Sequence, residues 1–168
     1  MKHKTFVMKK TILTLALFAG MLFASSGYNG KVFGTEQGDW APVVSFTEDD
    51  APVSVDQFRG KYLLLSFWSS TDASSRVDVN KYSSWIGSIS ADANVDHVAV
   101  NFDTNRTLFD EIVRRDNLTG TKQFNVQGDI ARDIIESYGL SDGFGSVLID
   151  PQGRVSAINP SKEELTAL

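Results

Sequence analysis

The sequence predicts one α/β domain, a three-layer sandwich in which a mixed central sheet carries helices on both faces. A continuous apolar run at 62–68 is typical of a strand that is buried on both sides, and a second, mostly apolar run at 95–102 is expected to be the second central strand. A helix-like apolar stripe separates these runs, and a strand–turn–strand pattern follows at 146–158. Because alternating strands and helices followed by a hairpin favour this architecture, we expect the element order βαβα(α)ββα.

Before the first buried strand, we expect a short strand and a single helical turn. The strand is predicted at 43–46, and the acidic segment at 48–52 is typical of a turn. Ser54 is a favourable cap for a helical turn at 55–58, and Gly60 would end that turn.

Helices are predicted on both sides of the second buried strand. Asp72 opens the first of them, whose apolar residues recur at spacings of three and four: Val79, Tyr82, Ile86 and Ile89. A second helix is expected at 105–116, followed by an edge segment at 123–126. A third helix carries Ile130, Ile134 and Ile135 and stops at Tyr138-Gly139.

The carboxyl-terminal part is predicted to form a hairpin and a last helix. The hairpin strands are expected at 146–149 and 154–158, joined by a turn of Asp, Pro, Gln and Gly. Ser161 is the expected cap of the last helix, which is predicted to include Leu165 and Leu168.

The first 26 residues have the pattern of a secretory signal peptide. Four lysines precede an apolar run from Ile12 to Phe23, and small residues follow it. The run is short for a membrane span, which makes an uncleaved anchor the less favoured alternative. We therefore expect 1–26 to be a signal peptide, 27–38 a linker and 39–168 the folded domain, exported to the periplasm or the cell exterior.

The charge of the chain limits its partners. Without residues 1–26 the chain carries 12 basic and 21 acidic residues, a formal charge of −9. An acidic surface of this size disfavours nucleic acid and anionic lipid as partners. Any membrane contact would then come through an uncleaved signal segment, and we expect the partner to be an envelope or secreted polypeptide.

Four segments, in this order and spacing, resemble those of a known superfamily. They are Gly-Asp-Trp-Ala-Pro at 38–42, the helical turn with Gly-Lys and the core strand at 55–68, Tyr-Gly-Leu at 138–140, and Leu-Ile-Asp-Pro-Gln-Gly-Arg-Val at 148–155. Together they resemble the thioredoxin-like superfamily, in particular exported TlpA/ResA-type thiol–disulfide proteins and their AhpC/TSA relatives. The resemblance implies a thioredoxin-like three-layer sandwich and a redox function.

The same resemblance shows what this chain lacks. The two positions of the superfamily's Cys-x-x-Cys pair hold Asp72 and Ser75, and the whole chain contains no cysteine. The position of the superfamily's cis-proline holds Phe144, and we expect a trans peptide there because a cis bond before a non-proline residue costs about 2.5–4 kcal/mol. Thiol–disulfide exchange needs a thiolate, so the resemblance implies a degenerate active site.

Two interpretations of Asp72 and Ser75 remain open at this point. One is a repurposed anion site at a helix N-terminus. The favoured one is structural, because Asp is a preferred N-cap residue and typically contributes about 1 kcal/mol there.

Other catalytic chemistry has little support in the sequence. A hydrolase would need Ser74 or Ser75 as nucleophile and His97 as base, but His97 is expected to be a satisfied histidine within a strand. One histidine and no cysteine argue against a transition-metal site, and the acidic turn at 48–50 is expected to be only solvated. We therefore assign no catalytic residue, no cofactor and no metal.

The remaining candidate is a binding face in place of the redox site. In the superfamily, the loops that carry these positions grip extended substrate peptides, which implies a face of five residues here: Trp68, Ser70, Thr71, Gly143 and Phe144. Aromatic residues are enriched at binding hot spots, but Phe144 could equally fill the space left by the missing residues. We predict a redox-inactive protein-binding or scaffold module; the alternative is a thiol–disulfide or antioxidant protein acting only with thiols supplied by a partner.

Overall fold

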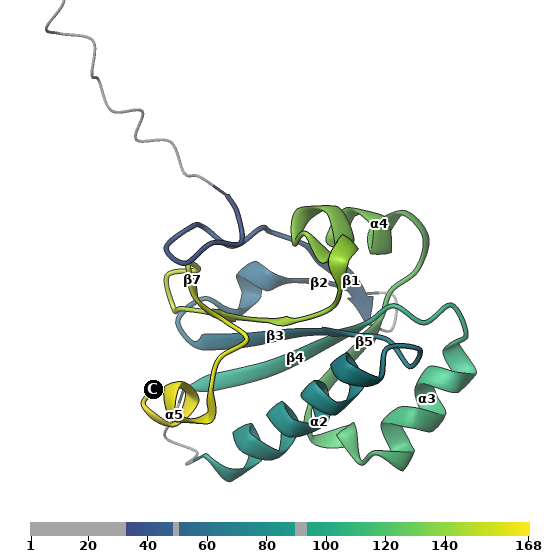
Figure 1. Ribbon diagram of the computed structural model, residues 1–168. Coiled ribbons are helices and arrows are strands. Elements are labelled where there is room, and N and C mark those ends of the chain that lie inside the picture. Colours follow the sequence, from purple (N-terminus) through teal and green to yellow (C-terminus); the bar gives the residue numbers. More distant parts are fainter. Residues whose placement is uncertain (1–32, 49–50, 90–93) are drawn as a thin grey trace, which may run out of the picture. The chain divides into compact units, whose positions relative to one another are not determined.

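A five-stranded mixed sheet in the order β5-β4-β3-β6-β7 forms the centre of the structure (Figure 1). This computed structural model describes residues 33–48, 51–89 and 94–168, all within one unit, Lys31–Leu168. The predicted signal peptide at 1–26 and the acidic residues Asp49 and Asp50 lie outside the described residues.

The strand directions follow from the connections between the strands. Parallel pairs join β3 (Tyr62–Trp68) to β4 (Val95–Asn101) and β4 to β5 (Lys122–Asn125). Antiparallel pairs join β3 to β6 (Ser146–Ile149) and β6 to β7 (Val155–Ile158). Since β6 runs against β3, the end of β3 and the start of β6 lie at the same edge of the sheet, with Ser66 opposite Ser146.

Helices cover both faces of this sheet, as predicted (Figure 1). On one face, α4 (Gly128–Ser137) packs its Ile134 into the core that holds Leu63, Leu65 and Phe67. The alternate residues of β3 face α2 (Ala73–Ser88), α3 (Arg106–Arg115) and α5 (Lys162–Thr166). This alternation is the period-two pattern of a strand, which the continuous apolar sequence of β3 conceals.

Most of the predicted elements are present with small changes at their ends. Strand β3 and the 3-10 helix η2 (Val55–Phe58) have the predicted bounds, and Ser54 caps η2 by accepting from the Asp56 N–H. Ser161 caps α5 in a capping box with Glu164. Two further 3-10 helices, η3 (Leu118–Gly120) and η4 (Leu140–Asp142), were not expected.

Three predictions near the ends of the chain are wrong in detail. The first strand is β1 (Ser45–Glu48), two residues later than predicted, and it pairs with an unpredicted β2 (Ala51–Ser54). Helix α5 ends at Thr166, so Leu168 lies beyond it. Part of the predicted linker is folded: Gly38 donates to the Val155 carbonyl, which extends the edge of β7.

Candidate functional site

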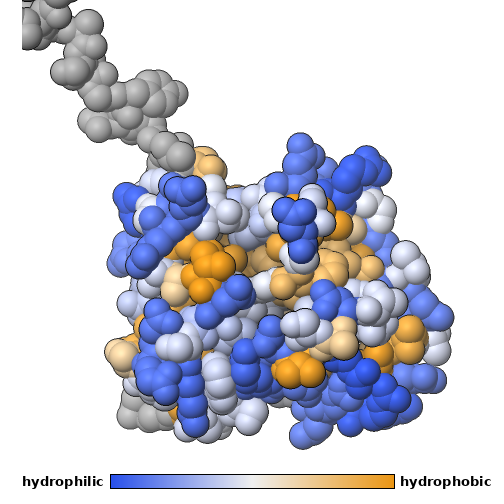
Figure 2. Space-filling view, in the orientation of Figure 1, coloured by the Kyte–Doolittle hydropathy of each residue, from blue (hydrophilic) through white to orange (hydrophobic). Residues whose placement is uncertain are grey.

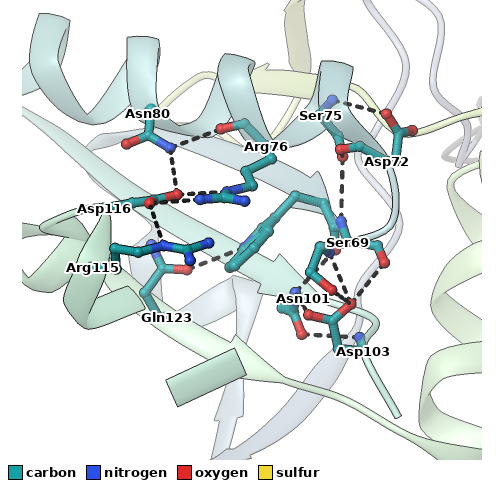
Figure 3. Close-up of polar contacts among 12 residues, drawn as sticks. Ser69, Asp72, Ser75, Arg76, Asn80, Asn101, Asp103, Arg115, Asp116 and Gln123 are labelled. Carbon is teal, nitrogen blue, oxygen red and sulfur yellow. Dashed lines mark hydrogen bonds and ion pairs between the residues drawn. The ribbon is translucent and has the colours of Figure 1, made fainter. Parts of the chain in front are cut away.

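The turn between β3 and α2, residues 69–72, occupies the position where the resemblance places reactive thiols. Asp72 is the N-cap of α2, with an extended backbone and a carboxylate that accepts from the Ser75 N–H at 3.1 Å. The Ser75 hydroxyl is buried, donates to the Asp72 carbonyl at 3.1 Å and accepts from the Ser69 N–H at 3.3 Å (Figure 3). The capping interpretation is therefore confirmed, and both side chains are already used within the turn.

A buried carboxylate just beyond β4 holds the same turn in place. One carboxylate oxygen of Asp103, Oδ1, accepts from the Ser69 hydroxyl at 2.7 Å, the Ser70 N–H at 2.9 Å and the Ser70 hydroxyl at 3.0 Å. Asp103 is only 5% exposed. Hydrogen bonds to a charged acceptor are among the stronger ones in proteins, so Asp103 fixes the geometry of residues 69–70.

Amides from two neighbouring strands support this carboxylate. Asn101 donates to the other oxygen of Asp103 at 3.0 Å and accepts from the Asp103 N–H at 2.9 Å. Asn125 donates both to Asn101 and to the Asp103 carbonyl at 2.8 Å. The carboxyl ends of β3, β4 and β5 are thus tied together by one polar network under the turn.

An ion pair fixes the first turn of α2 against the end of α3. The guanidinium of Arg76 donates to both oxygens of Asp116, at 2.6 and 2.7 Å, and Asn80 adds a third donor (Figure 3). The hydrogen bonds from Arg76 hold the pKa of Asp116 below its usual range, and those to Asp116 raise the pKa of Arg76. This bidentate geometry leaves the Arg76 charge compensated.

Trp68 belongs to the core and not to a binding face. Its side chain is fully buried among Val79, Phe109 and Ile112. Its indole N–H donates to Gln123 Oε1 at 3.2 Å. The expectation that Trp68 lines an exposed face is therefore wrong. Side chains of a strand alternate between the two faces of the sheet, and Trp68, like Leu64, packs into the core on the α2 side.

The loop before β6, residues 139–145, carries the other predicted positions. The structure has no cis peptide among the described residues, as expected for Phe144. Gly143 is exposed and has φ +140°, a conformation that side chains rarely allow. The Phe144 ring is partly buried and stacks on Phe102, with centroids 5.1 Å apart and planes 15° apart.

A surface groove of about 320 Å³ runs beside this loop. Its lining includes Leu140, Phe144 and Ile158, the last of which is 46% exposed. The backbone N–H of Phe144 has no hydrogen-bond partner within the described part of the chain. Phe144 therefore both fills space against Phe102 and presents one side to a groove.

Thr71 and Ser70, the remaining residues of the predicted binding face, differ in their exposure to solvent. Thr71 is exposed, although its hydroxyl lies 2.9 Å from that of Ser69. Ser70 is half-buried and commits both its N–H and its hydroxyl to Asp103. The structure thus leaves Thr71, Gly143 and Phe144 as the accessible members of the predicted face.

His97 is a buried and satisfied strand residue, as predicted. Its Nε2 lies 3.0 Å from the Ser66 hydroxyl and its Nδ1 lies 3.3 Å from the Thr121 hydroxyl. The chain of contacts continues at both ends, from Ser66 to Ser146 at 2.8 Å and from Thr121 to Ser83 at 2.7 Å. No bond joins His97 to Ser74 or Ser75 in the described ranges, so the hydrolase arrangement is absent there.

Burial dominates the titration of His97. Removal of the imidazole from water lowers its pKa to about 3. The imidazole is therefore neutral at physiological pH, and it cannot act as a base for an external substrate while it is only 7% exposed.

The described residues have two further properties, which concern clustered metal ligands and membrane-spanning helices. They contain no group of three or more potential metal-ligating side chains. In the same part of the chain, none of the helices combines the length and apolar character that crossing a membrane requires.

Sequence reasoning missed Asp103, which organises the site. Its partners Ser69 and Ser70 are more than 30 positions away along the chain. One signal was available: Asp103 follows directly after a buried strand, and the carboxyl ends of parallel strands meet at one edge of a sheet.

Comparison with known proteins places this architecture in a defined class. No protein-family model and no curated protein matches the sequence. Among solved structures, a thioredoxin-like protein from Parabacteroides distasonis is 27% identical with a TM-score of 0.65, over 81% of this chain and 96% of that one.

Two other solved structures carry a redox function in their names. The thioredoxin domain of a thiol-disulfide oxidoreductase from Bacteroides vulgatus is 22% identical, with a TM-score of 0.68 over 79% of this chain and 94% of that one. A thiol:disulfide interchange protein from a Bacteroides species has the same identity and TM-score, over 79% and 86% of the two chains.

The protein therefore has a thioredoxin-like fold, as its sequence predicted. Its structural neighbours include thiol-disulfide oxidoreductases, and it differs in having no cysteine anywhere in its sequence.

Proposed function

We propose that this protein is an exported, redox-inactive module that binds a polypeptide through the face built by Thr71, Gly143 and Phe144. The observation that carries the proposal is the pairing of two facts. The chain has no cysteine, yet the turn at 69–72 is fixed by hydrogen bonds from Ser69 and Ser70 to Asp103.

The absence of thiol chemistry follows from the side chains at the turn. Disulfide exchange needs a thiolate, and neither a capping carboxylate nor a buried serine hydroxyl supplies one. The oxidoreductase function named for the structural neighbours could act here only with thiols supplied by a partner. A purified sample that reduces insulin by itself would contradict the proposal.

The groove beside residues 139–145 supports the binding role. Apolar side chains, among them Leu140, Phe144 and Ile158, line part of it, and the free N–H of Phe144 offers a hydrogen bond to an extended chain. Figure 2 shows apolar residues gathered in the middle of this side of the molecule, between α4 and α2, with hydrophilic residues around them. A polypeptide with an apolar side chain next to an exposed carbonyl fits this combination.

Export is supported by the signal-like pattern of residues 1–26. Expression of the full sequence in a bacterial host, followed by cell fractionation and amino-terminal sequencing, tests it. We expect a product in the envelope or the medium that begins after about residue 26. A product that keeps Met1 and stays in the cytoplasm would contradict export.

The binding role is tested by site-specific crosslinking in the native envelope fraction. A photo-reactive amino acid replaces Thr71, and the captured polypeptide is identified, purified and titrated against the protein. We compare the parent with Phe144→Asp and with the matched control Leu108→Asp, which places the same charge on a partly exposed apolar position of α3.

Circular dichroism first establishes that both variants are folded. We expect Phe144→Asp to weaken binding of the purified partner at least tenfold, because a carboxylate in an apolar groove loses its hydration. Leu108→Asp should leave the affinity unchanged. Equal effects of the two substitutions, or none from Phe144→Asp, would place the function elsewhere.

A further inference from the structure

A second groove lies between the amino-terminal hairpin and α4, and it shares no lining residue with the groove beside Phe144. Its volume is about 440 Å³. One side is formed by residues 43–45 and the other by α4, where Ile130, Asp133 and Glu136 contribute.

The strand on the first side has an open edge. Strand β1 pairs with β2 alone, so its other edge has no strand neighbour in the described sheets. Hydrogen-bonded positions alternate in an antiparallel pair, and the bond from the Val55 N–H to the Val44 carbonyl fixes which positions these are. Ser45 and Thr47 therefore direct their backbone groups outward, because each belongs to a non-hydrogen-bonded pair.

The side chains along this edge combine apolar surface with uncompensated charge. Val43 is 47% exposed and Ile130 is 41% exposed, although both are large and apolar. Asp133 and Glu136 are exposed, and neither has an ion-pair partner among the described residues. The basic residue that precedes Asp133, Arg132, is paired with Asp129.

We propose that this groove binds an extended, cationic segment of a partner polypeptide, which adds to the outer edge of β1. Its backbone hydrogen-bonds to Ser45, as in other cases of strand addition. An apolar side chain of the segment packs between Val43 and Ile130. Flanking Lys or Arg side chains of the segment lie against Asp133 and Glu136, which selects a cationic partner.

This site is independent of the proposed function, since either groove can fail without the other. The probe is an acetylated and amidated pentapeptide of alternating residues, Lys-Val-Lys-Val-Lys. It is titrated into isotopically labelled protein that was expressed from the full sequence, and backbone amide shifts are followed by NMR. We expect the shifts to concentrate at residues 43–47 and 130–137.

Two variants separate the backbone and charge contributions. Ser45→Pro removes the outward N–H without removing a hydrogen bond between β1 and β2, and it should abolish the shifts while the hairpin stays folded. Asp133→Asn/Glu136→Gln should weaken binding about threefold to tenfold, the range for two exposed ion pairs. The matched control, Glu111→Gln/Glu163→Gln, makes the same charge change at exposed positions outside the groove and should leave the affinity unchanged.

Several outcomes would overturn this proposal. For the peptide, they are equally tight binding of the corresponding Glu-Val-Glu-Val-Glu peptide, shifts confined to residues outside the groove, or no shifts at millimolar peptide. For the variants, they are a loss of affinity in the control variant equal to that in Asp133→Asn/Glu136→Gln, or an unchanged affinity in Ser45→Pro. Shifts at residues 43–47 that depend on protein concentration alone would show that a second copy of this chain covers the edge instead.

Discussion

Two segments at the same edge of the central sheet are built in opposite ways. The first segment is the turn at 69–72 with the first residues of α2. Its polar side chains hydrogen-bond within the segment or to Asp103; they are those of Ser69, Ser70, Asp72 and Ser75. In the loop at 139–145, three of the seven residues are glycine, and Gly139 and Gly143 have positive φ. The difference shows that hydrogen bonds from side chains fix the turn, whereas the backbone conformation of glycines shapes the loop at 139–145, which we call the open loop.

Removal of the Asp103 carboxylate should have the largest effect on this comparison. Asp103→Ala removes the acceptor that the donors of Ser69, Ser70 and Asn101 share beneath the turn. We expect the free energy of unfolding to fall by about 2–4 kcal/mol, measured by urea denaturation.

The matched control is Asp142→Ala in the open loop, where the side chain is exposed. It should change the free energy of unfolding by about 0.5 kcal/mol or less. Similar losses from both substitutions would mean that the two segments are held equally, which contradicts the comparison.

Acid should lower the free energy of unfolding through His97, whose hydrogen-bonded contacts reach Ser146 at the end of the open loop. The folded state keeps the imidazole neutral, with a pKa of about 3, whereas the unfolded chain protonates near pH 6.5. The stabilising contribution is therefore complete above pH 6.5 and is lost as the pH falls from there toward 3. The expected slope is about 1.4 kcal/mol per pH unit, or about 2–3 kcal/mol between pH 6.5 and 4.5.

Urea denaturation across this pH range measures the slope, with His97→Gln as the reference because it cannot titrate. A slope that is the same in both proteins would show that His97 does not contribute. Hydrogen exchange sharpens the comparison, since Ser146, which follows the open loop, should lose protection in acid before Ser75 does.

Gly143→Ala tests whether the conformation of the open loop depends on the positive φ of Gly143. At φ +140° and ψ 167°, Gly143 lies in a region that is nearly closed to other residues. We expect a loss of about 1–3 kcal/mol in the free energy of unfolding, or a shift of the loop that moves the amide signals of residues 143–145. An unchanged protein would contradict this assignment.

The cap of α2 should give the smallest effect. Asp72→Ala is expected to lower the free energy of unfolding by about 1 kcal/mol, while Asp72→Asn, which can still accept from the Ser75 N–H, should lose only a fraction of that. Thermal denaturation of the two variants measures the difference. Equal losses from Asn and Ala would mean that the charge of Asp72, and not its capping oxygen, stabilises the helix.

The sequence predicted those features that depend on local pattern. The run at 62–68 gave the bounds of β3, and Asp72 and Ser161 were recognised as caps from residue type alone. Strand β2 was not predicted, because it contains Pro52 and lies between acidic residues that are typical of a turn.

Features that depend on contacts between distant residues could not be found in this way. The role of Asp103 depends on serines in another strand–helix connection, and the stack of Phe144 on Phe102 joins positions about 40 residues apart. The error at Trp68 has a different cause, because a wholly apolar strand hides which of its residues face each layer.

The contacts around His97 also join elements that are far apart along the chain. Ser146 donates to the Ser66 oxygen, and the Ser66 hydroxyl lies 3.0 Å from Nε2 of the imidazole. On the other side of the ring, Nδ1 lies 3.3 Å from the Thr121 hydroxyl, which lies 2.7 Å from that of Ser83. Because each hydroxyl group can donate or accept, both neutral tautomers of the imidazole keep a hydrogen bond at each ring nitrogen. A continuous row of polar contacts thus crosses the buried part of the molecule from β6 to α2, and it satisfies the imidazole without fixing its proton to one nitrogen.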